Sequence, residues 1–217
     1  MISPNGNSPI RSWPAYRFAP LEALEPRLLM SGNVVVRVVD GCLYLLGDAQ
    51  ANQIQVDQTG LPAGQYRVTG TAGTTLNGRE GEFVVENVQA LRIHLGRGDD
   101  AVTFQDLQLA GRVQVGLGYG DNTFEASAGT VGDLWLRSGQ GDDVFDLGGF
   151  ESSGLHLRVG GGADQITVDD LANLQRITAN LGSGNDSFRV TTAPDADTLA
   201  GCANHLRGGR GNEEQCS

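Results

Sequence analysis

The sequence predicts an all-β fold, a parallel β-solenoid of about 21–22 residues per coil that is capped by an irregular, β-rich N-terminal region. A Gly-x-Gly-Asp-Asp type of pattern occurs five times, with first glycines at positions 96, 118, 139, 160 and 182 and spacings of 22, 21, 21 and 22. A fixed period of this length is typical of a solenoid. Apolar residues at every second position flank each pattern, which is the period of a strand. The 32 glycines and few aromatics agree with a β protein rich in turns.

The chain divides into four regions by pattern. These are a polar leader (1–32), a β-rich N-terminal cap of irregular coils (33–90), the five-repeat solenoid (91–190), and a loop with a degenerate terminal repeat (191–217). The leader carries several prolines and no apolar segment of the kind found in secretory signal peptides. Leucines at 21, 24, 28 and 29 would form one side of a short helix, an alternative reading in which this segment covers the solenoid end.

The N-terminal region reads as strands joined by turns. Asp40-Gly41 is a strong hairpin signal between two apolar runs, 34–39 and 42–46. Further strands are expected at 53–56, 65–69 and 82–85, and residues 46–52 resemble a decayed copy of the repeat corner. We expect this region to cover the end of the stack, because a bare solenoid end exposes a strand edge.

Each repeat of the solenoid region reads as strand, Gly-Asp corner, strand and a looser return of about eight residues. One such unit cannot bury its own apolar face, but stacked units form a continuous core. Glycine suits the corner because it accepts positive φ, and Asp and Asn bond to nearby backbone N–H groups.

Stacking would arrange the corner acids in two columns. One column contains Asp100, Asn122, Asp143, Asp164 and Asp186, and its neighbour contains Asp99, Asp121, Asp142, Ala163 and Asn185. Like charges about 5 Å apart repel by about 1 kcal/mol in water. The columns therefore need backbone donors, protons or cations, and Ca²⁺ is the natural cation because it prefers oxygen ligands. A structural turn ladder without metal explains the same residues.

The corner also resembles a known calcium-binding repeat. Gly96-x-Gly98-x-Asp100-x-Val102 is similar to the nonapeptide of RTX-type calcium β-rolls from its second position onward, as are the repeats at Gly139, Gly160 and Gly182. The resemblance implies Ca²⁺ as the cofactor of the corner residues. Two departures stand against it: the first glycine of the nonapeptide is absent, and the pattern recurs every 21–22 residues rather than every nine.

A second resemblance lies near the N-terminus. Leu24-Glu25-Pro26-Arg27-Leu28-Leu29 is similar to the LEPR-XLL motif carried by large, repetitive, exported bacterial proteins, many of them from planctomycetes. This resemblance implies an exported or cell-surface protein and implies no activity.

One strand face offers candidate binding residues. Its outward positions carry Arg92, His94, Gln114, Trp135, Arg137, His156 and Arg158. Of these, Trp135, Arg137, His156 and Arg158 would form a basic stripe with an aromatic ring, which suits an acidic polysaccharide. An exposed, solvated sheet face is the simpler alternative.

Composition restricts the partners. The net charge of −11 argues against nucleic acid and anionic membranes, and no apolar run reaches the length of a membrane span. Cys202 and Cys216 flank one loop and are either a disulfide or two free thiols. At the C-terminus, 208–213 resembles a sixth corner after which no apolar strand is expected.

Two functions follow from these observations. The first is a non-enzymatic, exported or cell-surface structural or adhesive β-solenoid that binds Ca²⁺ at its corners. The alternative is a β-helix that binds or cleaves polysaccharide on the basic strand face. A relic of a larger repetitive protein, with no separate activity, is a third possibility. No grouping of Ser or Cys with His suggests a nucleophile and its base, so no enzymatic activity is expected.

Overall fold

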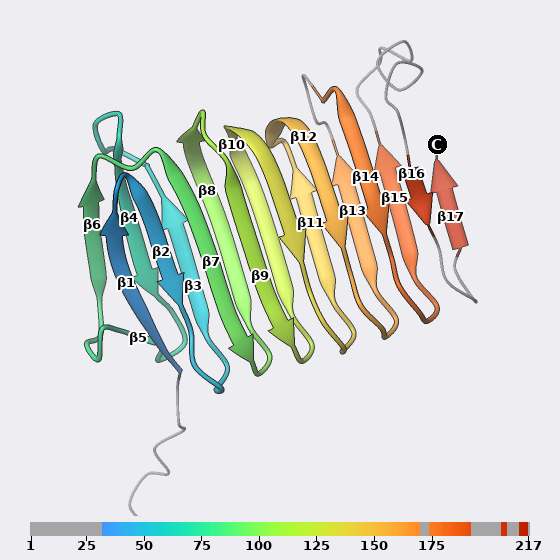
Figure 1. Cartoon of the computed structure of the whole chain (residues 1–217), viewed down its shortest axis with the longest axis horizontal. Coiled ribbons are helices and arrows are strands. Elements are labelled where there is room, and N and C mark those ends of the chain that lie inside the picture. Colours follow the sequence, from blue (N-terminus) through green and yellow to red (C-terminus); the bar gives the residue numbers. More distant parts are fainter. Residues whose placement is uncertain (1–31, 170–173, 192–204, 208–212, 217) are drawn as a thin grey trace, which may run out of the picture.

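Parallel strands stacked rung upon rung form the body of the molecule (Figure 1). The structure is a computed structural model that describes residues 32–169, 174–191, 205–207 and 213–216, and no helix occurs among them. The leader with its LEPR-XLL-like segment and the Cys202–Cys216 pairing lie outside the described residues and side chains. The strands are β1 (Asn33–Val39), β2 (Cys42–Leu46), β3 (Gln53–Asp57), β4 (Gln65–Gly70), β5 (Thr75–Leu76), β6 (Glu82–Glu86), β7 (Ala90–Arg97), β8 (Ala101–Leu109), β9 (Val113–Tyr119), β10 (Thr123–Arg137), β11 (Val144–Gly148), β12 (Glu151–Arg158), β13 (Gln165–Asp169), β14 (Arg176–Asn180), β15 (Ser187–Thr191), β16 (His205–Arg207) and β17 (Glu213–Cys216).

The strands form two parallel stacks that face each other. We call the first the front sheet: β2, β7, β9, the second half of β10, β12 and β14 pair in this order. The second is the back sheet, in which β3, β8, the first half of β10, β11, β13 and β15 pair in the same way. The predicted β-solenoid is confirmed.

The apolar core lies between the two sheets and is made of aligned columns. In the front sheet, Leu43, Leu91, Val113, Leu134, Leu155 and Ile177 follow one another from rung to rung, and all are buried. In the back sheet the equivalent column runs Ile54, Val102, Phe124, Phe145, Ile166 and Phe188. The rings of Phe124 and Phe145 meet edge to face, with centroids 6.4 Å apart. Each strand therefore finds its apolar cover within the stack, as the alternating pattern predicts.

Tight corners join the front sheet to the back sheet, and they require glycine. Gly118 and Gly120 have φ of 104° and 124°, a region that residues with a Cβ rarely adopt. A Cβ at Gly118 would also overlap the carbonyl oxygen of Gly96 on the rung before it. The glycine positions thus serve both the turn and the close approach of successive coils.

The return of the coil differs from the expected loose loop of about eight residues. In the first and second repeats much of it is strand, because β8 extends to Leu109 and β10 continues from the back sheet into the front sheet. Gly129 to Val131 pair with Leu107 to Leu109. Asp106 and Ala128, with φ of 49° and 53°, make the bend that precedes this segment. Main-chain hydrogen bonds between equivalent segments of successive coils order the return. The residue types of the return do not predict these bonds.

The N-terminal region adds antiparallel strands to the first coil. β1 pairs with β2 through the Asp40-Gly41 turn, as expected, and β4 pairs with β3 and β6. The strands β2 and β3 also pair in parallel with β7 and β8, so residues 46–52 form a first corner. This part of the chain is therefore both a cap and the first rung of the solenoid.

The C-terminal end extends the stack beyond the fifth repeat. β16 pairs in parallel with β14, and β17 pairs in parallel with β15. The sequence predicted no apolar strand after the segment 208–213, and the strand found there, β17, is a polar one. Its residues are polar apart from Cys216, and an edge strand can form from main-chain pairing alone.

Candidate functional site

The corners bring the first set of predicted site residues into a continuous ladder of hydrogen bonds. We call Asn52, Asp100, Asn122, Asp143, Asp164 and Asp186 the inner column. In each of its steps, the backbone N–H of one residue donates to Oδ1 of the residue on the next coil, over 2.8 to 3.1 Å. All six residues are buried. Asn52 extends the predicted column by one rung, since residues 46–52 form a true corner.

The Asn and Asp members of the inner column differ at their second side-chain atom. Nδ2 of Asn122 donates to the carbonyl oxygen of Gly120 at 2.7 Å, and Nδ2 of Asn52 does the same to Gln50. The four aspartates place an oxygen, Oδ2, where the asparagines have this donor. In the described part of the chain, Oδ2 of Asp100, Asp143, Asp164 and Asp186 is buried and has no hydrogen-bond partner. A buried oxygen left without a partner costs about 1–3 kcal/mol, so a proton or a cation at Oδ2 would stabilise the fold.

Burial favours the protonated form of the carboxyl groups of Asp100, Asp143 and Asp164. It raises the pKa of Asp100 to about 7, against hydrogen bonds from Asn52 that lower it. It also raises the pKa of Asp164 to about 6, and it raises the pKa of Asp143. A protonated Oδ2 can donate to a corner carbonyl in the way that Nδ2 of Asn122 does. The inner column can thus form a neutral ladder of amides and carboxylic acids.

The second predicted set lies at the surface of the corner. We call Asp99, Asp121, Asp142, Ala163 and Asn185 the outer column, and all five are exposed. Here the carboxylates point toward the following coil: Oδ1 of Asp99, Asp121 and Asp142 accepts the backbone N–H of the next member at 2.7 to 2.9 Å. Backbone donors thus provide part of the compensation that both columns need.

The geometry of the corners also bears on metal binding. Within the ranges that the structure describes, no three His, Cys, Asp or Glu side chains form a group that could hold an ion. The candidate ligands are instead distributed along the corners, one inner and one outer member to each rung. Calcium binding by these residues stays a prediction.

The front sheet brings the other predicted residues together. Trp135 and His156 occupy paired positions on β10 and β12, and their rings stack with centroids 4.0 Å apart. Arg137 and Arg158 are paired two residues further along the same strands, and both are exposed. Burial lowers the pKa of His156, as do Arg176 and Arg112, while Asp133 opposes them. The imidazole is therefore neutral at pH 7 and stacks on the indole as an uncharged ring.

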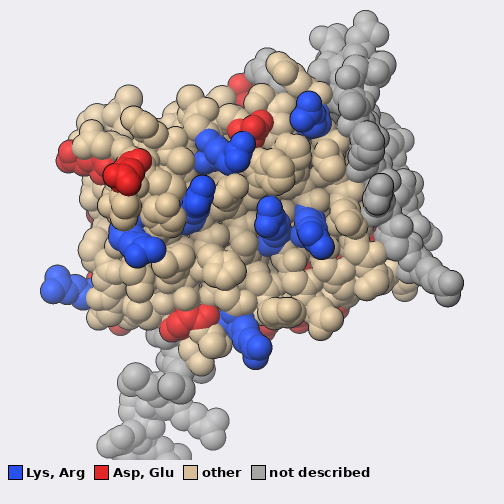
Figure 2. Space-filling model, viewed as in Figure 1, with Lys and Arg blue, Asp and Glu red and all other residues tan. Residues whose placement is uncertain are grey.

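More arginines lie on this face than the sequence pattern selected. Arg37 and Arg112 join the predicted Arg92 on it, and each of these three guanidinium groups lies 5.2 to 5.9 Å from the ring centre of Tyr44 or Trp135. Figure 2 shows the face: blue side chains gather over its middle, whereas red ones lie mainly toward its margins. The ion pairs among the described residues join Arg67 to Asp57 and to Glu82, in the N-terminal hairpins. Arg92, Arg112, Arg137 and Arg158 have no carboxylate partner within that part of the chain.

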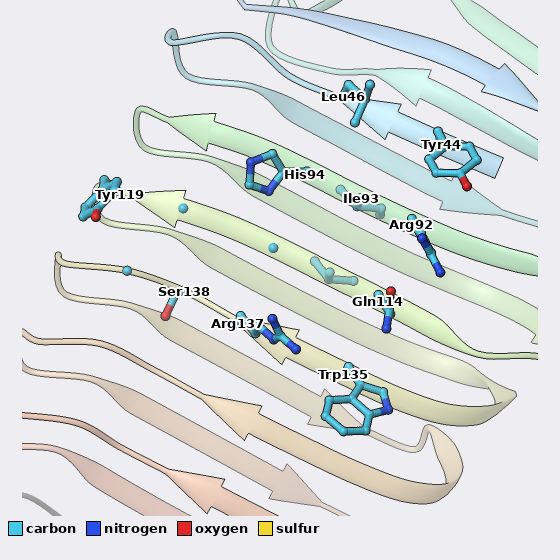
Figure 3. A pocket seen from close by; sticks show the side chains of 14 residues that line it. Tyr44, Leu46, Arg92, Ile93, His94, Gln114, Tyr119, Trp135, Arg137 and Ser138 are labelled. Carbon is cyan, nitrogen blue, oxygen red and sulfur yellow. The ribbon is translucent and has the colours of Figure 1, made fainter. Parts of the chain in front are cut away.

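A groove of about 600 Å³ crosses the front sheet beside the stacked rings. Figure 3 shows Tyr44, Arg92, Gln114 and Trp135 in one row across four strands, with Leu46, His94 and Arg137 in the next row toward the corner. Tyr119 stands at the corner end of the groove. None of the described residues that line it is Asp or Glu. Aromatic, cationic and amide side chains line the groove, and such a lining suits a flat, anionic, hydroxyl-rich ligand.

Sequence reasoning missed Tyr44, Arg112 and Tyr119. Tyr44 was assigned to the cap, although β2 continues the front sheet and places it in the row of Arg92 and Trp135. Treating the apolar run 42–46 as the strand before the corner at 46–52 would have found it. Arg112 precedes its strand and Tyr119 ends one, so an alternation pattern gives no signal for either.

Comparison with known proteins found no match for this chain, whether among family models, curated proteins or solved structures. The fold and its surface are therefore the basis for a functional assignment. They define the chain as a parallel β-solenoid with a cationic, aromatic front sheet. None of the residues described belongs to a helix that is long and apolar enough to cross a lipid bilayer.

Proposed function

We propose that this protein is an exported, non-enzymatic β-solenoid that binds anionic polysaccharide on its front sheet as a component of a surface or matrix. The observation that carries the proposal is the alignment of the Trp135–His156 stack with Arg137 and Arg158 on adjacent rungs. Aromatic faces pack against the C–H faces of sugar rings, and guanidinium groups bind carboxylate or sulfate in a fork of two hydrogen bonds. Export rests on the resemblance of residues 24–29 to the LEPR-XLL motif.

Charge supports an anionic ligand more strongly than a solvated surface. The chain carries 26 acidic and 15 basic residues, and all 15 of the latter are arginine. A random distribution would leave any large face acidic, yet the front sheet is basic. Arg137 lies next to Arg158 without a carboxylate partner among the described residues, and such like-charged neighbours repel by about 1 kcal/mol at the strand spacing. The fold does not require this repulsion between the two arginines, and a bound anionic ligand would offset it.

Affinity electrophoresis tests the proposal. The full chain is run in gels that contain polygalacturonate, dextran sulfate or neutral dextran. We expect retardation by at least one of the anionic polymers and none by neutral dextran, and Arg137→Ala with Arg158→Ala should weaken it about tenfold or more. Arg79→Ala with Arg189→Ala removes the same charge away from the front sheet and should have little effect. Equal retardation of the two double variants would contradict the proposal, and new reducing ends in the polymer would identify an enzyme instead.

We propose calcium binding at the corners as a second candidate function. The observation in its favour is the unpartnered Oδ2 of four buried aspartates, which offers hard oxygen to a cation. A ligand bound only by the folded state raises the unfolding temperature by mass action. If Ca²⁺ binds, millimolar Ca²⁺ should raise that temperature and equal Mg²⁺ should raise it less. An unchanged unfolding temperature at pH 8, where the carboxyls are ionised, would leave the corners as a ladder of hydrogen bonds without metal.

A further inference from the structure

The groove on the front sheet is centred on a residue without a side chain. Gly116 lies on β9 between His94 of β7 and Arg137 of β10, in one row across the sheet. Its neighbours in the row project outward, so the missing side chain leaves a hollow between them. Gln114 and Trp135 border the hollow on one side, and the corner glycines Gly118 and Gly139 border it on the other.

The backbone does not require glycine at this position. The φ of Gly116 lies outside the left-handed region, unlike that of the corner glycine Gly118. A Cβ built on Gly116 would meet Nδ1 of His94 at 3.2 Å and the carbonyl oxygen of Ile93 at 3.7 Å. The first contact is with the movable end of a side chain, and the second is an ordinary one. Glycine within a strand costs about 0.5–1 kcal/mol relative to alanine, so neither turn geometry nor packing explains this residue.

We infer that the hollow over Gly116 is the subsite for one acidic sugar unit of a polysaccharide that crosses strands β7, β9 and β10. This inference rests on the proposed function and deepens it. The anionic group of the sugar, a carboxylate or a sulfate, lies between the guanidinium groups of Arg92 and Arg137, and the sugar ring packs beside Trp135. The polymer runs along the row of Tyr44, Arg92, Gln114, Trp135 and His156, perpendicular to the strands.

Three features of the hollow select this occupant. Its described lining contains two arginines and no acid, in a chain with a net charge of −11, so charge complementarity requires an anion. The aromatic rings of Tyr44 and Trp135 lie at the two ends of the neighbouring row, which borders the hollow and suits a chain of flat rings. The site lies on the face of the sheet and not at its edge, so an acidic peptide would gain no main-chain pairing there.

Filling the hollow provides the test. Gly116→Leu projects a side chain into the groove and leaves every arginine in place. We expect it to weaken retardation by the anionic polymer about tenfold or more, and Gly116→Ala should give a smaller loss in the same direction. The matched control is Gly148→Leu on the back sheet, where a Cβ would meet only Oδ1 of Asp146 at 3.7 Å. That control should bind as the original chain does, within about twofold.

The polymers and a second variant separate the possible outcomes. Polygalacturonate and dextran sulfate distinguish a carboxylate subsite from a sulfate subsite. If Gly116→Leu lowers the unfolding temperature, His94→Trp blocks the hollow from the neighbouring strand instead. If both blocking variants bind like the original chain while the Arg137→Ala/Arg158→Ala variant does not, the subsite is wrong and the proposed function stands. If the original chain is not retarded by either polymer, or prefers polyglutamate or single-stranded DNA, both are overturned.

Discussion

The front and back sheets are built from the same coils and carry opposite charge. Facing the core, both alternate apolar residues at every second position, and their columns are buried alike. Facing solvent, the front sheet presents arginines beside tyrosine and tryptophan rings. Outward positions of β10, β11, β13 and β15 in the back sheet carry Glu125, Asp146, Asp169 and Arg189. Core packing thus constrains only the inward-facing residues of each strand, and the outward-facing residues can differ between the two sheets.

An acidic back sheet needs no special explanation in this protein, and a basic front sheet does. Glu125 pairs with Asp146 on the next rung, just as Arg137 pairs with Arg158, so each sheet has like charges side by side. In a chain of net charge −11 the acidic pair follows from composition, whereas the arginine pair departs from it. This difference supports the proposal that the front sheet, and not the back sheet, binds an anionic partner.

Reversing the charge of the front sheet should have the largest effect on binding and should remove the difference in charge between the two sheets. Arg137→Glu with Arg158→Glu places two carboxylates where the proposal puts anionic sugars. Repulsion then replaces attraction, and we expect binding of dextran sulfate to fall by about a hundredfold or more. Affinity electrophoresis at low ionic strength measures the loss, because salt screens exposed charges.

The back sheet supplies the matched control for charge. Glu125→Gln with Asp146→Asn changes the net charge by two in the opposite direction. If binding depended on net charge alone, this variant would gain as a general effect of its lower negative charge. We expect a change of no more than about threefold, since these residues lie on the opposite face. Packed sheets lie about 10 Å apart, and the Debye length is about 10 Å at 0.1 M salt. A gain as large as the loss in the front-sheet variant would reduce the comparison to bulk charge.

Much of the fold follows from the sequence because its repeat is carried by a few residue types. Glycine at each corner and apolar residues at every second position predicted the period, the stacking and the core. The return was harder: the strand pairing of Gly129 to Val131 with Leu107 to Leu109 depends on main-chain hydrogen bonds, which residue types do not encode. β17 shows the same limit, because a polar segment pairs with β15 through its backbone.

The site was predictable only where it follows the strand period. Trp135, Arg137, His156 and Arg158 lie at outward positions of two paired strands, and alternation found them. Arg112 lies over Trp135 from outside a strand, with its guanidinium 5.7 Å from the ring centre. The hollow over Gly116 depends on the absence of a side chain, and one glycine of the 32 in the chain gives no signal until its φ and its neighbours are known.

The corners join the two sheets, so changes in the inner column should affect both sheets equally and leave the difference between them intact. Burial raises the pKa of Asp100 to about 7 and that of Asp164 to about 6, above the value of about 4 for an unfolded aspartate. A raised pKa in the folded state means that stability is full at low pH and is lost as the pH rises. We expect the free energy of unfolding to decline between about pH 4 and pH 7, by about 1–3 kcal/mol for each buried carboxyl group.

Asparagine at the same positions sharpens this test. Asn52 and Asn122 already occupy the inner column, so Asp100→Asn with Asp164→Asn should fit the ladder and supply the donor that Oδ2 lacks. Chemical denaturation at pH 5 and pH 8 should show a smaller pH dependence and a gain in stability at pH 8. Asp146→Asn, at an exposed position of the back sheet, is the control and should leave the slope as it is. A variant pair that is less stable at pH 8 than the original chain would show that the ionised carboxyls contribute to the fold, as they would with bound Ca²⁺.

The smallest expected effect concerns His156, whose ring stacks on that of Trp135. Burial lowers its pKa, and Arg176 and Arg112 act in the same direction. The ring therefore gains a proton only at pH values below the ordinary histidine pKa of about 6.5. Protonation adds a cation beside Trp135, where cation–π attraction accommodates it, and should tighten binding of an anion.

With dextran sulfate, whose sulfate groups stay ionised, we expect constant affinity from pH 8 to pH 6.5 and a gain of about threefold at pH 5. His156→Gln should remove that gain. A gain that persists in His156→Gln would assign the pH dependence to another group and would leave the stack at Trp135 as a neutral platform for the sugar ring.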